Sequence, residues 1–135
     1  MRAARGAGVP PTALGRAFKE PVNALTHLGG ALAAVAATIA LAVLARSSSM
    51  ALAAFLVFGA SSVLLFSAST LLHAVRAGPA LATWLRRLDH GAIYVLIAGS
   101  YTPIALVALQ PERAALGWWL FGLTWLLALG GLVFK

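Results

Sequence analysis

Cysteine is absent from this chain, and acidic residues are nearly so. Without cysteine there can be no disulfide framework, thiolate metal site or thiol nucleophile, so a metal ion would need histidine, carboxylate or water ligands. The sequence also lacks a glycine-rich phosphate loop and a G-x-S-x-G nucleophile elbow. Charged residues make up only 10% of the chain, where a soluble domain has about 25%. Because 61% of the residues are hydrophobic, the composition indicates a membrane protein.

Basic residues outnumber acidic ones, with ten lysines and arginines against three aspartates and glutamates and a net charge of +7. In a soluble protein this balance would suggest nucleic-acid binding. Here the basic residues lie between long apolar runs, where they set the orientation of a protein in the bilayer. We therefore expect membrane lipids as partners and no nucleic acid. The oligomeric state stays open.

Four apolar runs reach the length of about 20 residues that a helix needs to cross a membrane. We predict spans at about 21–45, 50–75, 88–109 and 115–134, with a kink in the third near Pro103. Leu81–Leu85 is predicted as a separate short interfacial helix, with Trp84 at headgroup depth. Residues 1–20 are predicted to form a disordered basic tail. The predicted fold is an all-α, polytopic transmembrane helix bundle formed by residues 21–135.

Lysines and arginines divide unevenly between the two sides of this predicted bundle. The tail, the connection between the second and third spans, and Lys135 together carry eight of them on one side. Arg46 and Arg113, in the other two connections, place two on the opposite side. Because cytoplasmic loops are enriched in basic residues, this count predicts a cytoplasmic N-terminus. All three histidines, Glu20 and Asp89 then fall near the cytoplasmic face.

The second span ends in Ser69 and His73, and the third opens on Asp89 and His90. Ser69 and His73 are four residues apart and share a helix face, so the serine could support the histidine or a water beside a bound metal. Ionisable groups inside spans are costly to bury, which makes each of them a functional-site hypothesis. The structural alternative is that His73 reaches the interface while Ser69 bonds to its own helix.

A purely structural role is a strong alternative for Asp89 as well, because a carboxylate at a helix start can cap free N–H groups. Neighbouring residues point about 100° apart on a helix, so Asp89 and His90 cannot both face one pocket. We predict that Asp89 points inward and that His90 is an interfacial or supporting group.

Glu20, Asn23 and His27 form one stripe of the first span. The first two could simply serve the helix N-terminus. His27 lies deeper and needs a partner such as Asn23 or Thr26. We predict that all three support a metal ligand rather than bind metal directly, with direct ligation by His27 as an alternative.

Three segments carry a resemblance to a known family: E-P-V-N-A-L-T-H at 20–27, S-x-x-x-H at 69–73, and R-R-L-D-H-G-A-I-Y-V-L-I-A-G-S-Y-T-P at 86–103. In these residues the sequence resembles the hemolysin III family of bacterial membrane proteins. That family is related to the progestin and adipoQ receptors, which include the adiponectin receptors, and more distantly to alkaline ceramidases. The matching segments cover most of residues 20–109 in the family's order.

The resemblance implies a seven-helix bundle with a cytoplasmic N-terminus and a zinc ion near the cytoplasmic side. It assigns one zinc ligand to His73 and gives Ser69 and Asp89 a role in supporting the metal or its water. The family's other two ligands form an H-x-x-x-H pair on the last helix. This chain has no histidine after His90, so it looks C-terminally truncated by three helices, with an incomplete zinc site.

Three functions are carried forward. The first is an integral membrane protein of the hemolysin III type in the plasma (inner) membrane, with half a zinc site and a cytolytic or membrane-regulatory role. The second is a zinc-dependent lipid amide hydrolase, active only in a full-length form, in which Asp89 positions or deprotonates a water and Ser69 supports it. The third is a small oligomeric transporter that uses Glu20 or Asp89 as its proton-coupling acid.

Overall fold

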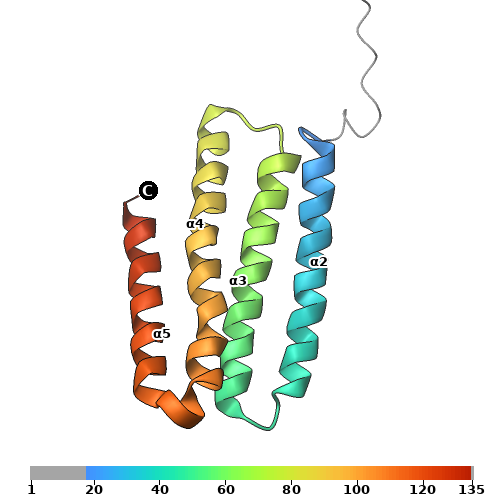
Figure 1. Ribbon diagram of the computed structural model, residues 1–135. Helices are drawn as coiled ribbons and strands as arrows, with labels where there is room; N and C mark the ends of the chain where they lie inside the picture. The colour runs from blue at the N-terminus through green and yellow to red at the C-terminus, as the bar shows by residue number, and fades with distance from the viewer. Residues whose placement is uncertain (1–17, 135) are drawn as a thin grey trace, which may run out of the picture.

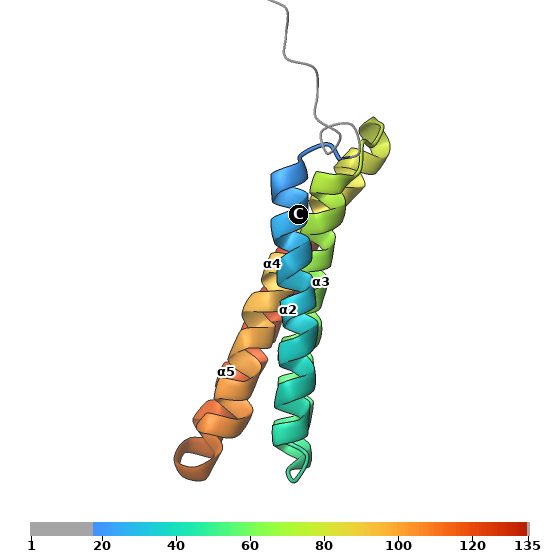
Figure 2. The ribbon, with the colours of Figure 1, turned by 90° about the vertical axis from the view of Figure 1, so that its right-hand side faces the viewer.

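The computed structural model describes residues 18–134 and, within them, four helices long and apolar enough to cross a membrane. They are α2 (Pro21–Leu44), α3 (Ser49–Ala74), α4 (Pro79–Pro103) and α5 (Gln110–Val133), with a short π-helix, η1 (Ile104–Ala108), between the last two. Each helix packs against the next along the chain. Figure 1 shows the four helices standing in one row in sequence order, and Figure 2 shows α4 and α5 inclined to α2 and α3.

The bounds of the first two helices agree with the predicted spans to within one residue. Pro21 occupies the start of α2, where its missing N–H costs no hydrogen bond. Ser48 caps α3 by accepting a hydrogen bond from the backbone N–H of Ala51 at 3.3 Å. The predicted disordered tail at 1–20 lies outside the described residues, except for its last three.

The third helix differs from the prediction. Leu81–Leu85 is not a separate interfacial helix, because α4 begins at Pro79 and runs without interruption through the whole segment. Neither glycine nor a second proline occurs between Pro79 and His90, and Arg86 and Arg87 are good helix formers. The arginines were interpreted as part of a connection because of their charge, but charge alone does not end a helix.

The predicted kink near Pro103 takes the form of the short π-helix η1, which we call the π-turn. Proline has no N–H, so the carbonyl of Gly99 loses its helical partner. The backbone then widens, and the N–H of Leu109 bonds to the carbonyl of Ile104 at 3.1 Å. α5 begins at Gln110, earlier than the predicted start of the fourth span at about 115, and has a break at Arg113, where φ is −140° and ψ is 47°.

Small residues fill the interior of the row, and large apolar residues face outward. The most buried apolar side chains are mainly alanines, among them Ala24, Ala54, Ala98 and Ala105. Long apolar side chains such as Leu32 and Leu126 are about two-thirds exposed, at 65% and 68%. This distribution is typical of a membrane protein, in which small residues let helices approach closely and lipid covers the larger ones.

The residues before α2 are hydrogen-bonded to the end of α3. The backbone N–H groups of Lys19 and Glu20 donate to the carbonyls of Ala74 and His73 at 3.2 and 3.0 Å. The Arg76 guanidinium donates to the carbonyl of Phe18 at 2.8 Å. These bonds satisfy carbonyls that a helix end leaves free. They bring the start of α2 and the end of α3 to one level, which we call the His73 end of the row.

Candidate functional site

A side-chain hydrogen bond joins α3 to α4 near the His73 end. The hydroxyl of Ser69 donates to the carboxylate of Asp89. Ser69 is 7% exposed, and the Asp89 side chain is 15% exposed. The predicted inward orientation of Asp89 is therefore what the structure contains. The structural alternative required Ser69 to donate to a carbonyl of its own helix. Its hydroxyl instead donates to the Asp89 carboxylate.

Asp89 does not cap a helix N-terminus. Because α4 begins at Pro79, Asp89 lies in the fourth turn, beyond the free N–H groups of the first turn. A carboxylate in a helix interior between packed helices needs a partner for its charge. Ser69 provides it, which removes capping as the explanation for an acid at this position.

His73, one turn from Ser69 on α3, faces α2. Its Nδ1 lies 2.7 Å from Oε2 of Glu20, a carboxylate that can only accept when ionised. Nδ1 therefore carries the proton and donates it to Glu20. In a neutral imidazole this leaves Nε2 as the free lone pair, the form in which histidine binds a metal. A carboxylate behind a histidine is the usual partner of a metal-binding imidazole.

Three donors surround the Glu20 carboxylate and keep it ionised. The Asn23 amide donates to Oε2 at 3.0 Å, the Lys19 ammonium lies 3.1 Å from Oε1, and His73 completes the set. Together, and in that order of size, they lower the pKa of Glu20 from its ordinary 4.5 to about 2. Glu20 is therefore a fixed negative charge at neutral pH.

His27 stacks on His73. The two ring centroids lie 5.3 Å apart with an angle of 8° between the planes, and the ring of Phe66 lies 6.3 Å away on the other helix. Neither Asn23 nor Thr26 is bonded to His27; Thr26 instead donates to carbonyls of its own helix. The expected polar partner of His27 is thus replaced by ring stacking, which fixes the orientation of the His73 imidazole.

His90 points away from this cluster, as predicted from its position next to Asp89. Its Nδ1 donates to the carbonyl of Arg86 at 2.8 Å and lies 3.8 Å from Oδ2 of Asp89, and its side chain is 47% exposed. His90 therefore lies beside the site, on the outer face of α4.

The donor set does not complete a zinc site. Zinc in proteins takes at least three protein ligands, and among residues 18–134 no group of three histidine or acidic side chains is placed to hold a metal ion. The chain supplies one histidine in a metal-binding tautomer, a carboxylate behind it and the Ser69–Asp89 pair. The half zinc site inferred from the resemblance, with its other ligands outside this chain, stays a prediction.

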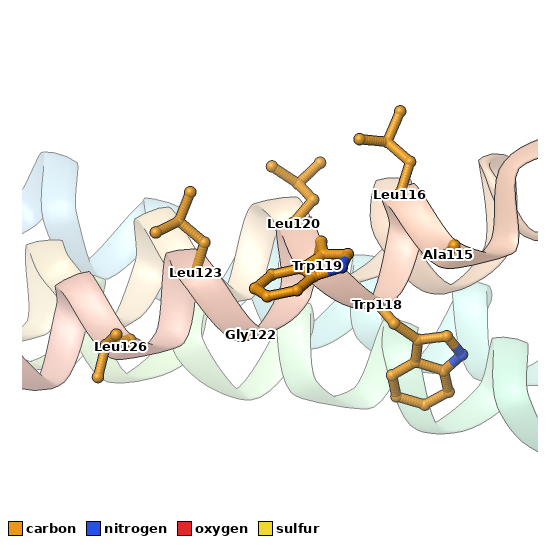
Figure 3. Close-up of a pocket in the computed structure, with 8 residues that line it drawn as sticks. All are labelled: Ala115, Leu116, Trp118, Trp119, Leu120, Gly122, Leu123 and Leu126. Carbon is orange, nitrogen blue, oxygen red and sulfur yellow. The ribbon is translucent and has the colours of Figure 1, made fainter.

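An apolar hollow in the surface lies elsewhere, on α5. Figure 3 shows it on α5, with Leu116, Leu120 and Leu123 projecting to the same side of one helix. Its other lining residues are also apolar or small, and they include Trp118 and Trp119. Its side chains carry no titratable group and no polar group apart from the two indole N–H groups, so we regard it as a face for hydrocarbon.

The sequence interpretation missed two members of the cluster. Lys19 was assigned to a disordered tail, although its position beside Glu20 signals an ion pair. Phe66 was not singled out, although it lies one turn before Ser69 and two before His73, on the side that meets α2.

Comparison with known proteins identifies the family. Residues 16–135 match the family model described as "Haemolysin-III related". The chain is 44% identical over 119 residues to "Hemolysin-3" of Bacillus cereus, which covers 87% of this chain and 52% of the relative. It is 42% identical over 119 residues to the "Hemolysin-3 homolog" of Bacillus subtilis strain 168, covering 87% and 54%. The chain thus spans about half the length of these curated relatives. No solved structure matches it significantly.

Proposed function

The chain belongs to the haemolysin-III-related family of multi-pass membrane proteins, and we propose that it contributes the first half of a zinc site that such a protein uses for a cytolytic or regulatory activity on membranes. We further propose the plasma membrane as its location, with the His73 end facing the cytoplasm, because eight of the ten basic residues belong to that side.

The observation that supports this proposal most strongly is the Glu20–His73 pair. Donation from Nδ1 to a carboxylate holds the imidazole in one tautomer and one orientation, with Nε2 as the free lone pair. A histidine that merely reached the membrane interface would need no such partner. The stacked ring of His27 restricts the same imidazole further.

Ser69 and Asp89 add a second polar contact one turn deeper on α3. We propose that they support a water beside the metal in a protein that also carries the remaining ligands, since a carboxylate aligned by a hydroxyl can orient a neighbouring water. The remaining ligands would come from the part of the longer relatives that this chain does not match. Zinc, when bound, would supply Lewis acidity at this position.

Metal analysis tests this assignment. The 135-residue chain and the Bacillus cereus relative are purified in the same detergent, and zinc is measured by elemental mass spectrometry. We expect clearly less than one zinc per chain here and close to stoichiometric zinc in the longer protein. Equal zinc in both would contradict the division of ligands. His73→Gln should reduce what zinc the short chain holds, whereas the matched variant His90→Gln should not.

Leakage of a dye from lipid vesicles tests the proposed activity. The longer relative, reconstituted with and without a zinc chelator, should release dye only while metal is bound if the role is cytolytic. Release that the chelator does not change would separate the activity from the site. No release under either condition would leave the regulatory role as the surviving form of the proposal.

A lipid amide hydrolase is a second candidate, favoured by the Ser69–Asp89 hydrogen bond. In this mechanism Asp89 accepts a proton from the attacking water, and Ser69 holds its carboxylate in place. Fatty-acid release from ceramide by the longer relative would support it, and loss of that release on replacing the matching aspartate by asparagine would assign the base. The transporter hypothesis is weakened for Glu20, because a carboxyl with a pKa of about 2 stays ionised at neutral pH.

A further inference from the structure

The start of α4 extends beyond its neighbours. Ser69 and Asp89 fix the register between α3 and α4. From Asp89 back to Pro79 the helix rises about 15 Å, whereas from Ser69 to the end of α3 at Ala74 it rises about 7 Å. The first turns of α4 therefore stand above the end of α3, as Figure 1 shows. On the other side of α4, Leu132 of α5 lies against Gly91. Because α5 ends at Val133, the first turns of α4 extend beyond α5 as well.

This overhang lies at the depth of the lipid headgroups. α4 and η1 together comprise 30 residues from Pro79 to Ala108, a length of about 45 Å. The hydrocarbon core of a bilayer is about 30 Å thick, so roughly the first ten residues of α4 exceed it. Trp84 lies in this segment with 57% of its surface exposed. Tryptophan is enriched at the membrane interface, which agrees with this depth.

The overhang carries two arginines without an acidic partner. Arg86 and Arg87 are exposed, and no ion pair in the described part of the chain involves either of them. Arg86 makes only a long bond of 3.4 Å to the hydroxyl of Thr83. The chain has three acids in all. Glu20 is taken by its three donors and Asp89 points inward to Ser69.

The third acid is at the opposite end of the row. Glu112 occupies the first turn of α5, next to the π-turn and away from the His73 end. None of the three acidic side chains is therefore available as a partner for the arginines of the overhang. Leu85 and Asp89 face the interior of the row. Thr83, Arg86, Arg87 and His90 share the opposite face by their spacing of three, four and seven residues.

We propose that this outer face of α4, formed by Thr83, Arg86, Arg87 and His90 with Trp84 beside it, binds the phosphate headgroups of anionic phospholipids. Guanidinium groups donate paired hydrogen bonds to phosphate oxygens, and a hydroxyl and an indole at the same depth complete an interfacial anchor. Basic residues near an anionic membrane surface attract its lipids electrostatically. The site needs neither zinc nor any residue of the Ser69–Asp89 pair.

Spin-labelled lipids test this proposal. The full chain is reconstituted into phosphatidylcholine vesicles, and electron paramagnetic resonance measures how strongly labelled phosphatidylglycerol is immobilised relative to labelled phosphatidylcholine. We expect the wild type to prefer phosphatidylglycerol, and we expect Arg86→Gln/Arg87→Gln to reduce this preference at least about twofold. Arg86→Lys/Arg87→Lys should keep most of it. The matched control Arg46→Gln/Arg113→Gln, with the same loss of charge at the opposite end, should change it little.

Four results would overturn the proposal. They are no preference in the wild type, an unchanged preference in Arg86→Gln/Arg87→Gln, an equal loss in the control pair, and a loss when inorganic phosphate replaces chloride at constant ionic strength. The last result would identify a site for a free anion rather than a lipid. Far-UV circular dichroism of each variant verifies that the helices persist, so that a lost preference reports on binding.

Discussion

The imidazole of His73 lies 2.7 Å from the carboxylate of Glu20, although 53 residues separate them in the chain. This contact joins α2 to α3, and one turn away Ser69 joins α3 to Asp89 of α4. The central helix of these three thus holds one polar side chain toward each neighbour. A polar layer of this kind connects α2, α3 and α4 near the His73 end. The predictions below follow from it and from the packing around it.

Ser69→Ala removes the hydroxyl that accompanies the Asp89 carboxylate. We expect the free energy of unfolding to fall by about 1–3 kcal/mol, because a buried acceptor loses its partner. Unfolding by sodium dodecyl sulfate in mixed micelles measures the change. Ser62→Ala is the matched control on the same helix, since the Ser62 hydroxyl bonds only to the carbonyl of Phe58 in its own helix. An equal cost for both serines would contradict the special role of the Ser69–Asp89 bond.

Glu20 gives the His73 end a dependence on acidic pH. Since folding lowers the pKa of this carboxyl from 4.5 to about 2, its contribution to stability is complete above about pH 4.5 and is lost as the pH falls toward 2. Between about pH 4.5 and pH 2, we expect the free energy of unfolding to fall less in Glu20→Gln than in the wild type. Tryptophan fluorescence in detergent across pH 2–6 measures it. The control Glu112→Gln should leave the window unchanged; an equal effect of both variants would contradict the assignment.

Gly117 is where α5 approaches the backbone of the π-turn. A Cβ added there would overlap the carbonyl oxygen of Ala105, which cannot move like a side chain. We expect Gly117→Ala to lower the free energy of unfolding by about 1–3 kcal/mol. Gly122→Ala is the control on the same helix, because a Cβ at Gly122 meets nothing within 4 Å. It should leave stability unchanged or raise it by up to about 1 kcal/mol. Equal effects would refute the close approach at Ala105.

Thr102 anchors α5 to α4 through a buried hydroxyl. It is 1% exposed and accepts a hydrogen bond from the indole N–H of Trp125 at 3.1 Å. We expect Thr102→Val to cost about 1 kcal/mol, a value usual for such bonds inside membranes, and to shift the indole N–H resonance of Trp125. The hydroxyl of Thr124 bonds only to carbonyls of its own helix. Thr124→Val should therefore cost less and leave that resonance in place.

Much of the fold follows from the sequence, because apolar length and proline position determine spans directly. α2 and α3 agree with the prediction to within one residue. The start of α4 was placed nine residues too late, because arginines were taken as the mark of a loop. Helix propensity of the backbone outweighs charge there, and the helix continues out of the hydrocarbon to Pro79.

The site was only partly predictable. Helix geometry alone predicts that Asp89 and His90 point in different directions, and the structure confirms the prediction that Asp89 is the inward one. The hydrogen-bonding partner of each side chain could not be predicted, because spacing within one helix does not indicate which neighbouring helix that side chain faces. His73 was expected beside Ser69 and Asp89, and Glu20 and His27 were expected only to support a metal ligand that the spacing did not specify; in the structure His73 pairs with Glu20 and stacks on His27. Only the packing of α2 against α3 determines that choice.

Cross-linking between α3 and α4 tests the central claim most directly. The chain has no cysteine, so Ser69→Cys/Asp89→Cys introduces the only thiols. A short bifunctional thiosulfonate is added in membranes, and trypsin then cuts at Arg76, Arg86 and Arg87 between the two positions. If the side chains meet as described, the two fragments stay joined on a non-reducing gel, whereas in the matched pair Ser69→Cys/His90→Cys they separate. Joined fragments for the His90 pair and separate ones for the Asp89 pair would contradict the account.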